Sequence, residues 1–423
     1  MKVLVVGGGG REHALCWGLV RSPRLTDLVA APGNAGIAEV ARVIPDATAD
    51  DVRALVSVAA RERPDLIVIG PEAPLVAGLA DTLRDRGFAV FGPGADAARL
   101  EGSKAYAKGL MVEGGIPTAR AASFTEVDRA LAFVDALSGR AVVKADGLAA
   151  GKGVTVAMDR DAAAVALHDC LDDRVFGDAG TTVLVEELLE GPEVSAFALV
   201  DSHSVAPLAL SQDFKQVGDG DRGPNTGGMG AYSPLPWVDA VTEDRIWTIV
   251  GDTVNALRGR GMTYRGLLYT GFMLTADGPK VLEYNCRFGD PETEVVIPRL
   301  ESDLADLLEA AATDALAGIK VAMNDAAAVT VVLASGGYPG PHTTGVPIEG
   351  LGDAAAIAGA TVFHAGTVRR GDTVATAGGR VLAVTGTGAT IDEARTTAYK
   401  AADRITFEGK THRRDIAAGA AIS

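Results

Sequence analysis

The sequence has few cysteines, and their number and spacing exclude a disulfide framework. Only three occur among 423 residues, at Cys16, Cys170 and Cys286. They are odd in number, lie far apart and form no CxxC pair, whereas disulfide-stapled proteins carry paired cysteines at regular spacing. We therefore expect free thiols and a protein of the reducing cytosol.

Basic residues are also scarce relative to acidic ones. Lysine and arginine number 39 against 55 aspartates and glutamates, which gives a formal net charge of −16. Proteins that bind nucleic acids neutralise phosphates with basic side chains, so this balance argues against a nucleic-acid partner. A small anionic ligand stays possible, because it needs only local charge and backbone dipoles.

Long apolar runs are missing as well. No run reaches the ~18 residues that a membrane-spanning helix needs, and Met1 and Lys2 lead directly into a predicted strand instead of a signal peptide. We expect a cytoplasmic protein with no membrane partner. Aromatic residues make up only 5% of the chain and apolar residues 48%, so its cores should consist of Ala, Val and Leu. The length suffices for several domains.

Apolar strands and helices alternate over the first hundred residues. Such alternation predicts a parallel sheet covered on both faces, with ligands at the carboxyl ends of its strands. The predicted strands are 2–6, 28–30, 65–69 and 88–91, and the predicted helices are 14–20, 50–62 and 75–86.

Glycine-rich turns follow three of these strands. They occupy 7–10, 33–36 and 70–74 and should lie at one edge of the predicted sheet. With the basic Arg11 beside the first turn, they favour a shared phosphate site over three unrelated structural turns. A dinucleotide-binding fingerprint is not favoured, because its third glycine is missing and no acid ends the second strand.

Residues 142–156 read VVKADGLAAGKGVTV, which predicts two strands joined by a glycine-rich turn. A tip with so little side-chain bulk can place backbone N–H groups against an anion, and Lys144 and Lys152 add positive charge at its two ends. The spacing excludes a Walker loop, which needs a longer gap before its Gly-Lys pair, a following Ser or Thr and then a helix. We interpret the hairpin as a flap over nucleotide phosphates, the alternative being a hairpin without a ligand.

Two further stretches carry polar residues whose role depends on context. The strand predicted at 181–189 ends in acids, which either serve the adenine amino group and ribose hydroxyls or are simply solvated. The stretch 211–233 is polar and rich in glycine, so we expect a long irregular loop, either functional or disordered. Its segment 225–230, NTGGMG, can present backbone donors to a small carboxylate.

A second hairpin is predicted from strands at 270–274 and 280–285. Alternate residues of a strand share a face, so Glu283 and Asn285 should point the same way. Two oxygen ligands side by side suit Mg²⁺ held between protein and phosphates, and Arg287 can hold a phosphoryl group. The alternative is a set of polar residues at a strand end.

The pattern changes after a helix predicted at 300–317. No metal-ligand spacing appears beyond residue 321, so we expect an α+β domain that covers the others without chemistry of its own. Its predicted strands are 329–334, 361–364, 373–376 and 380–385, and its helix is 391–405.

Several strings resemble the phosphoribosylamine–glycine ligase family of the ATP-grasp ligases. They are VVGGGGREHAL, APGNAG, GPEAPL, LEGSKAY, KADGLAAGKGV, PNTGGMGAYSP and LEYNCRFGDPETE, and they cover essentially the whole chain. The resemblance implies an α/β and α+β multidomain protein. It would consist of an N-terminal parallel α/β domain at 1–103, an ATP-grasp domain at 104–321 with a mobile lid at about 121–189, and a small C-terminal α+β domain at 322–423.

The resemblance also implies roles for individual residues. Arg287 and Lys144 would be catalytic, and Glu283 and Asn285 would bind Mg²⁺ or Mn²⁺. ATP would be bound by Lys104, Lys144, Gly147, Gly151, Lys152, Gly153, Glu186, Glu187, Leu189 and Glu193. Phosphoribosylamine and glycine would lie against Gly9, Arg11, Asn34, Gly70, Glu72, Asp213, Asn225, Thr226, Gly228 and Met229.

The sequence departs from the family pattern at two places. Gly8 stands where members often carry Asn, which leaves a backbone phosphate site intact. Phe214, Lys215 and Gln216 stand where members often carry His-Lys-Arg, and we assign no catalytic role to Phe214.

The reaction that the resemblance implies is a step of purine synthesis. The carboxylate of glycine would take the γ-phosphate of MgATP, and the amine of phosphoribosylamine would displace phosphate from glycyl phosphate. Lysines, an arginine, a metal pair and glycine loops suit phosphoryl transfer, which needs positioning and charge neutralisation. We expect a monomer whose partners are these small molecules. The alternatives are an ATP-grasp ligase with another acid and amine, or a nucleotide-binding protein that is not an enzyme.

Overall fold

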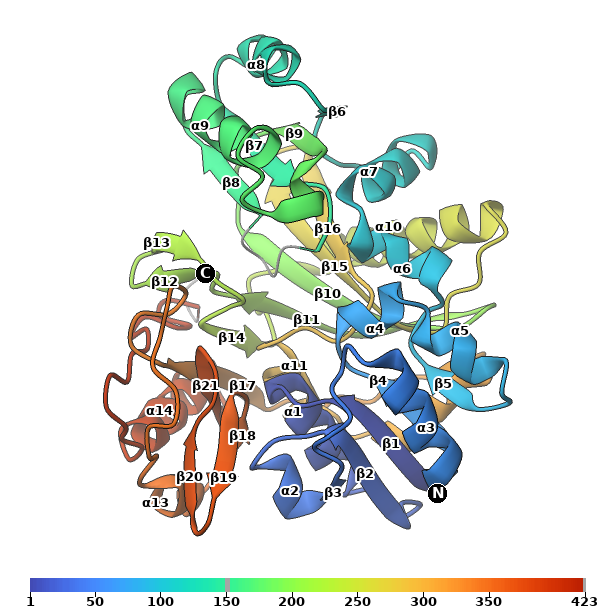
Figure 1. The fold of residues 1–423 in the computed structure, drawn as a ribbon, viewed down its shortest axis with the longest axis vertical. Coiled ribbons are helices and arrows are strands. Elements are labelled where there is room, and N and C mark those ends of the chain that lie inside the picture. The colour runs from blue at the N-terminus through green and yellow to red at the C-terminus, as the bar shows by residue number, and fades with distance from the viewer. Residues whose placement is uncertain (149–152, 421–423) are drawn as a thin grey trace.

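The computed structural model describes residues 1–148 and 153–420. Within these ranges the strands form three main sheets and two short two-stranded ribbons. A lobe at the top of Figure 1 is set off from a larger body that holds both the first and the last part of the chain. None of the helices in the described residues is long and apolar enough to cross a membrane.

The N-terminal sheet is parallel throughout, with the strand order β3-β2-β1-β4-β5, as the alternation of strands and helices predicts. Its strands β1 and β4 are apolar and buried, which is typical of a parallel sheet covered on both faces. Its strands and first helices are β1 (Lys2–Gly7), α1 (Gly10–Leu19), β2 (Asp27–Pro32), α2 (Ile37–Val40), β3 (Arg42–Val43), α3 (Val52–Glu62), β4 (Leu66–Ile69) and β5 (Ala89–Phe91).

The helix predicted at 75–86 is two short helices in the structure, α4 (Glu72–Val76) and α5 (Leu79–Arg84). Gly78 separates them with a φ of +80°, a left-handed conformation that glycine adopts without steric cost. The apolar residues keep a helical spacing across this break, so their pattern does not reveal it.

The glycine turns gather at the carboxyl edge of the N-terminal sheet, as predicted. The Gly33 N–H donates to the Gly7 carbonyl over 3.1 Å, and a side chain at Gly8 would come within 2.4 Å of the Gly33 carbonyl oxygen. Only glycine permits so close an approach of two backbones. The first two turns therefore form one surface beside the N-terminus of α1.

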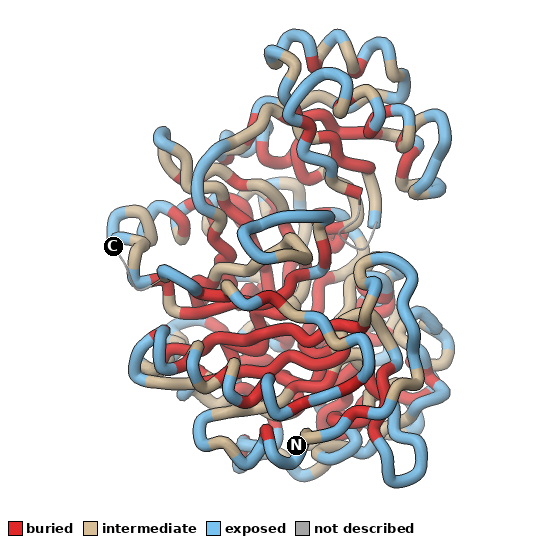
Figure 2. Tube along the Cα trace, turned by 90° about the vertical axis from the view of Figure 1, so that its left-hand side faces the viewer, coloured by how far each residue is buried: buried red, intermediate tan, exposed pale blue. Residues whose placement is uncertain are grey.

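The lobe at the top of Figure 1 contains an antiparallel sheet with the strand order β6-β9-β7-β8. It has a small core of its own, which includes Val143, Leu167 and Val185 and appears as the buried centre of the upper lobe in Figure 2. Helices α6 (Ala95–Gly102) and α7 (Lys104–Glu113) lead into the lobe. Its elements are β6 (Ala121–Phe124), α8 (Val127–Ala136), β7 (Ala141–Ala145), β8 (Val154–Ala157), α9 (Arg160–Leu171), η1 (Gly177–Gly180) and β9 (Val183–Glu187).

The largest sheet has eight strands in the order β16-β15-β10-β11-β14-β17-β21-β18. Because β14 pairs with β17, the C-terminal strands continue the sheet of the central segment. The sequence pattern did not predict this continuity. The strands are β10 (Glu193–Val200), β11 (Val205–Asp213), β14 (Gly230–Ser233), β15 (Gly266–Thr275), β16 (Gly278–Asn285), β17 (Ala327–Ala334), β18 (Ala360–His364) and β21 (Arg380–Gly388).

The expectation of a long irregular loop at 211–233 is wrong. The end of β11 pairs with β14, and β12 (Gln216–Gly218) pairs with β13 (Arg222–Asn225). The turn of this short hairpin holds Gly220 and Asp221 at positive φ, which glycine favours and aspartate tolerates. The glycine and polar residues of this stretch therefore form the turn between two paired strands and not an irregular loop.

Arg413, near the end of the chain, secures this hairpin. Its guanidinium donates to the Asp221 carboxylate over 2.7 Å and to the Gln216 carbonyl over 3.1 Å, and it lies over the ring of Phe214. Phe214 also packs against Tyr232. The side chain at position 214 thus has packing partners, in line with the absence of a catalytic assignment.

The helix predicted at 300–317 is shorter in the structure, where α12 spans Leu304–Ala312. Asp303 defines its start, since the carboxylate accepts from the Ala305 N–H over 2.8 Å as an N-cap does. The remaining elements are α10 (Ala240–Gly259), α11 (Thr293–Val296), η2 (Ile297–Arg299), α13 (Leu351–Ala355), β19 (Thr367–Arg370), β20 (Thr373–Thr376) and α14 (Ile391–Ala402).

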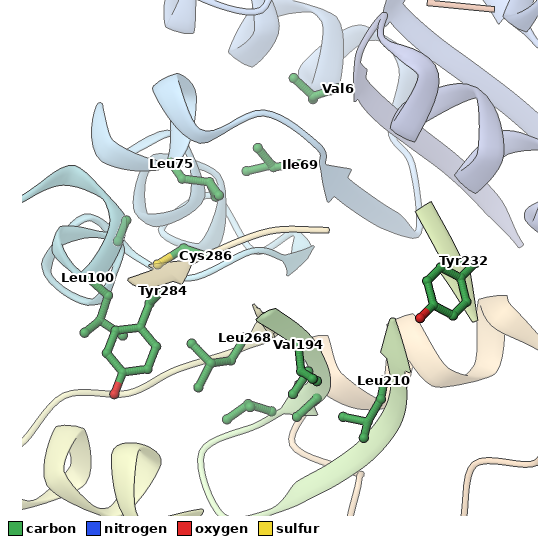
Figure 3. Packing of buried hydrophobic residues seen from close by; sticks show 14 of the residues in the cluster. Val6, Ile69, Leu75, Leu100, Val194, Leu210, Tyr232, Leu268, Tyr284 and Cys286 are labelled. Carbon is green, nitrogen blue, oxygen red and sulfur yellow. The ribbon is translucent and has the colours of Figure 1, made fainter. Parts of the chain in front are cut away.

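Apolar side chains from distant parts of the chain share one core. Figure 3 shows Val6 and Ile69 of the N-terminal sheet in the same cluster as Val194 and Leu268 of the large sheet. The three cysteines are free and buried, as their number and spacing predict. This shared core holds the N-terminal sheet against the large sheet.

Two buried histidines join the N-terminal and C-terminal segments. His13 on α1 accepts through Nδ1 from the backbone N–H of His364 on β18 over 2.7 Å, and the Asn34 amide donates to the His364 carbonyl over 2.6 Å. Burial, together with the neighbouring His364, lowers the pKa of His13 to about 3, and burial with the nearby Arg369 lowers the pKa of His364 to about 4. Both rings are neutral at neutral pH.

These histidines predict a loss of stability in mild acid. Below about pH 6.5 the unfolded chain takes up protons at these two histidines, while the folded chain does not. Each of the two therefore lowers the free energy of unfolding by about 1.4 kcal/mol per pH unit below that value. The loss continues until the folded pKa values of about 3 and 4 are reached. Urea unfolding between about pH 7 and pH 5 should show a shallower decline for His13→Asn than for the parent protein. The same substitution at the exposed His203 is the control, and equal declines for all three proteins would contradict the assignment.

Candidate active site

A cleft of about 640 Å³ is lined by residues of the upper lobe, the large sheet and the N-terminal segment. All parts of the chain contribute to its lining, from Arg11 near the start to Arg380 near the end. Of the residues predicted for a site, the structure brings together Arg11, Glu72, Lys104, Lys144, Gly147, Gly153, Glu186, Glu187, Leu189, Glu193, Asp213, Asn225, Thr226, Glu283, Asn285 and Arg287 along this lining.

Seven predicted residues are placed elsewhere or are not described. Gly9, Asn34, Gly70, Gly228 and Met229 do not line the cleft. Gly151 and Lys152 lie outside the described residues.

Two lysines share one buried carboxylate on the lobe side of the cleft. Glu186 at the end of β9 pairs with Lys144 of β7 over 2.7 Å and with Lys108 of α7 over 2.8 Å. Burial would raise the pKa of Glu186, but the two ammonium groups outweigh it and lower that pKa. Lys108 was not predicted as a site residue, although it lies one helical turn after Lys104 and so on the same side of α7.

A bulge in β16 places a backbone acceptor beside Lys144. The pairing of β15 and β16 slips at Leu282, because Gly271 faces Glu283 while Phe272 faces Val281. The Leu282 carbonyl, released from the ladder, accepts from Lys144 Nζ over 3.1 Å. Lys144 is therefore held from both the lobe and the large sheet.

Lys104 connects the start of α7 to the glycine-rich turn. Its Nζ donates to the Gly147 carbonyl over 2.8 Å, and Asp146 accepts from Ser103 Oγ over 3.0 Å and from the Ala105 N–H over 3.1 Å. Gly147 has a φ of +151°, and a Cβ there would lie 2.8 Å from the Ala179 side chain. The entrance to the turn thus requires glycine for both conformation and space.

Arg287 lies buried between two acids. Its guanidinium is 2.8 Å from Glu101 and 3.3 Å from Glu72, and the Cys286 N–H donates to the second Glu101 oxygen over 2.7 Å. Burial raises the pKa of Glu101, an effect that Arg287 only partly offsets. Glu101 was not predicted as a site residue, although it belongs to the characteristic string LEGSKAY that contains Lys104.

Glu283 and Asn285 are half-buried on the lining of the cleft, whereas Tyr284 between them also reaches the lining but is buried in the core and bonded to Thr253. The burial pattern agrees with the predicted alternation over 283–285, but the bulge interrupts it at Leu282, which lines the cleft as well. The Asn285 amide is satisfied when its nitrogen faces Glu101, to which it then donates over 2.9 Å. Its oxygen then lies on the side of the donors.

These two oxygens fit a Mg²⁺ ion shared with a nucleotide better than a metal site made by protein alone. The described residues contain no cluster of three or more His, Cys, Asp or Glu side chains that could hold a metal. Mg²⁺ is usually bound through one or two protein oxygens and completed by phosphates and water. Glu283 and Asn285 meet that requirement.

A salt-bridged cluster lines the cleft at the start of β10 and the end of β11. Lys215 lies 2.8 Å from the Asp213 carboxylate and 3.3 Å from Glu193. Burial would lower the pKa of Lys215, but the two carboxylates raise it well above its ordinary value. The cluster keeps net negative charge beside the segment 225–229.

The C-terminal segment also contributes to the lining of the cleft, although the sequence predicted only a covering role for it. Arg380 of β21 donates to the carbonyls of Gly227 over 2.6 Å and Asp290 over 2.7 Å, and it pairs with the Asp290 carboxylate over 3.2 Å. The Gly227 N–H donates to the hydroxyl of Tyr338 over 3.2 Å. This part of the chain thus holds a loop of the candidate site.

The N-terminus of α1 is occupied by protein acids. Glu12 accepts from the Gly9 N–H over 2.6 Å and pairs with Arg11 over 2.5 Å, and Asp290 accepts from the Arg11 N–H over 3.3 Å. Asn34 holds the neighbouring turn by donating to the Gly8 carbonyl over 2.9 Å. These contacts position the glycine turns relative to the cleft.

Known protein families and relatives match this chain over nearly its whole length. Residues 1–101, 102–293 and 328–419 match the N domain, the ATP-grasp (A) domain and the C domain of phosphoribosylglycinamide synthetase. The phosphoribosylamine–glycine ligase of Streptomyces coelicolor is 54% identical over 100% of both chains. That of Pseudomonas aeruginosa is 49% identical over 98% of this chain and 97% of the relative.

Solved structures give the same result. The crystal structure of the phosphoribosylamine–glycine ligase of Thermotoga maritima superimposes with a TM-score of 0.86 and 34% identity, over 98% of this chain and all of that one. The biotin carboxylase domain of the Hydrogenobacter thermophilus 2-oxoglutarate carboxylase shares the fold. It is 17% identical and superimposes with a TM-score of 0.74 over 97% of this chain and 91% of that one. The chain belongs to the phosphoribosylamine–glycine ligase family.

Proposed function

We propose that this chain joins glycine to phosphoribosylamine at the expense of ATP, with glycyl phosphate as the intermediate, as one step of purine synthesis. The observation that carries the proposal is a single cleft. Lys144 and the described ends of the glycine turn, Gly147 and Gly153, line the same space as Glu283 and Asn285. Phosphate-binding and metal-binding groups are thus placed to act on one triphosphate.

ATP is assigned to the lobe side of this cleft. Apolar side chains there, among them Met111, Val156 and Met273, suit a flat base, and the acids that follow β9 suit its amino group and the ribose. The residues assigned to ATP are Lys104, Lys144, Gly147, Gly151, Lys152, Gly153, Glu186, Glu187, Leu189 and Glu193. Lys108 joins them because it shares Glu186 with Lys144.

Glu283 and Asn285 are assigned to Mg²⁺, with Mn²⁺ as the alternative ion. When bound, such an ion neutralises charge on the phosphates and orients them. Arg287 and Lys144 hold the transferring phosphoryl group between them, and the lobe excludes water that would hydrolyse an acyl phosphate.

The two substrates are assigned to the opposite end of the cleft. Asp213 and the segment 225–229 are assigned to glycine, because a carboxylate suits its ammonium group. Phosphoribosylamine lies toward the N-terminal sheet, with Arg11 and Glu72 on the lining of the cleft and Gly9, Asn34 and Gly70 in the turns behind it.

Several general features belong to the same proposal. The domains are placed at 1–103, 104–321 and 322–423, with the lid at about 121–189. The protein acts as a monomer in the cytoplasm. Light scattering at assay concentration tests the monomer, since a dimer would double the observed mass.

An assay of ADP release tests the reaction. ADP should form only when ATP, glycine and phosphoribosylamine are all present, and glycinamide ribonucleotide should appear in equal amount. ADP release with another acid and amine would indicate a different ATP-grasp ligase. No ADP release with any pair would indicate a nucleotide-binding protein.

Replacing Arg380 with methionine should weaken binding of both substrates and spare that of ATP. The side chain ties the segment assigned to glycine to Asp290, which contacts α1 at the end assigned to phosphoribosylamine. Loss of these bonds should raise KM for glycine and for phosphoribosylamine by about tenfold each, which corresponds to ~1.4 kcal/mol. KM for ATP should not change. Arg370→Met, at an exposed position on β19, is the control, and a rise in KM for ATP alone would contradict the assignment.

A further inference from the structure

The acids that line the cleft differ in whether they have a partner. Nine described residues of the lining are acidic. Six of them form ion pairs, namely Glu72 and Glu101 with Arg287, Glu186 with Lys108 and Lys144, Glu193 and Asp213 with Lys215, and Asp290 with Arg380.

The other three acids of the lining form no ion pair within the described residues. Glu187 accepts a hydrogen bond from the Arg120 N–H over 2.9 Å, and Glu283 is assigned to the metal. Glu292 has no ion pair within the described residues and no role in the function proposed above. It is the carboxylate whose presence in the cleft needs an explanation.

Glu292 is buried yet reaches the cleft. Only 4% of its surface is exposed, and it lies directly before α11. Its Oε1 lies 3.5 Å from the Ser195 hydroxyl, a long contact, and Ser195 is in turn 2.9 Å from the Tyr269 hydroxyl. A Cβ at Gly289 would come within 2.4 Å of Glu292 Oε2, so the preceding loop wraps closely around the carboxyl group. The carboxylate is held in place by packing and neutral hydroxyls and is not neutralised by a cation.

The charged and titratable groups around Glu292 come from several elements. Asp213 and Lys215 act on it from the end of β11, Tyr269 from β15, Arg287 from the segment after β16, Glu294 from α11, and Arg380 from β21. Burial and the neighbouring Asp213 raise the pKa of Glu292 to about 7, against the opposing effect of Lys215. A carboxylate with such a pKa can both take up and release a proton near neutral pH.

We propose that Glu292 is the general base of the second step, which accepts the proton that the amine of phosphoribosylamine loses as the amide forms. The inference rests on the function proposed above. The bond from nitrogen to the glycyl carbon forms, and the bond from that carbon to the phosphate oxygen breaks with its electron pair going to phosphate. The nitrogen proton passes to the Glu292 carboxylate and then to the departing phosphate, which restores the base.

The position of Glu292 agrees with this role. It interacts with Arg287, assigned to the transferred phosphoryl group, and with Asp213, assigned to glycine. Under those two assignments, the carbonyl carbon of glycyl phosphate lies between Arg287 and Asp213, since it connects the amino end to the phosphate. A base beside both is next to the atom that the amine attacks.

Replacing Glu292 with glutamine keeps the shape of the side chain and removes the base. We expect kcat to fall by about 10²-fold to 10³-fold, within the range typical of general-base catalysis, while KM for ATP and glycine changes by less than about threefold. In the parent protein, kcat/KM for the amine should fall about tenfold per pH unit below about pH 7 because protonated Glu292 cannot accept a proton. In Glu292→Gln this limb of the pH profile should be absent.

The order of product formation separates the two chemical steps. In a rapid-quench experiment, the first equivalent of ADP should form in Glu292→Gln at the rate of the parent protein, with the amide forming far more slowly. The matched control is Glu294→Gln. Glu294 is a fully buried acid on α11 outside the lining of the cleft, and burial raises its pKa well above the ordinary value, so a neutral glutamine should replace it with no loss of activity.

Four results would overturn the proposal. These are an unchanged kcat in Glu292→Gln, a rise in KM for glycine with kcat retained, an equal slowing of ADP and amide, and an equal loss of activity in Glu294→Gln. The second would make Glu292 a glycine-binding group, and the fourth would trace the effect to the packing of α11. A parent protein that forms no glycinamide ribonucleotide would instead refute the proposed function.

Discussion

Glu283→Gln should reduce turnover by about 10³-fold, the largest effect expected of any single substitution in this cleft. Glutamine keeps the length of the side chain and its packing on β16 but removes the charge that a Mg²⁺ ligand needs. Glu283 forms no ion pair within the described part of the chain, so its removal should leave no buried cation without a partner. The thermal unfolding midpoint should therefore stay close to that of the parent protein.

The measurement is kcat as a function of free Mg²⁺ concentration. Glu408→Gln, at an exposed position, serves as the control for loss of one carboxylate. If Glu283→Gln turned over at a near-normal rate at low Mg²⁺, the residue would not be a metal ligand. Restoration of activity at high Mg²⁺ or with Mn²⁺ would support the role, because weaker binding can be offset by concentration.

Lys144→Met should lower turnover by about 10²-fold and weaken ATP binding, comparable to the loss of one strong electrostatic stabiliser. The ammonium group is fixed between the Glu186 carboxylate and the Leu282 carbonyl, so it is positioned before any nucleotide arrives. Lys108 remains 2.8 Å from Glu186 after the substitution, which keeps that buried acid paired. The fold should therefore be retained.

Steady-state kinetics with ATP as the varied substrate check this expectation. Lys400→Met, at an exposed position on α14, removes a lysine of the same size away from the cleft and should behave like the parent protein. An unchanged dependence on ATP in Lys144→Met would exclude Lys144 from the nucleotide site.

Much of the site was predictable because local patterns place its residues. The apolar run of β1 followed by glycines predicted a turn at the carboxyl edge of a parallel sheet, and the structure has it there. Strand alternation predicted that Glu283 and Asn285 share a face, since this depends only on the twofold period of β structure. Each of these features is decided within about ten residues of chain.

Other site residues depend on pairings that no local pattern contains. Arg380 lies more than one hundred and fifty residues from Gly227, whose carbonyl it holds, and the sequence around it reads as an ordinary strand. Glu101 gains its role only because Arg287 and Cys286 pack against it from another segment. The prediction of an irregular loop at 211–233 was wrong for the same reason, because β14 becomes a strand by pairing with β17.

The amino-acid sequence alone determined the family and the types of residue that line the cleft, because these follow from short motifs and from periods of two or 3.6 residues. Only the tertiary structure decided that the C-terminal strands extend the central sheet, that Arg380 reaches the cleft, and that Glu292 lies there with no ion pair among the described residues. The physical reason is that charge pairing and burial depend on distances between side chains. Those distances are set by the packing of segments that lie far apart in the sequence, and the local sequence pattern of each segment does not contain them.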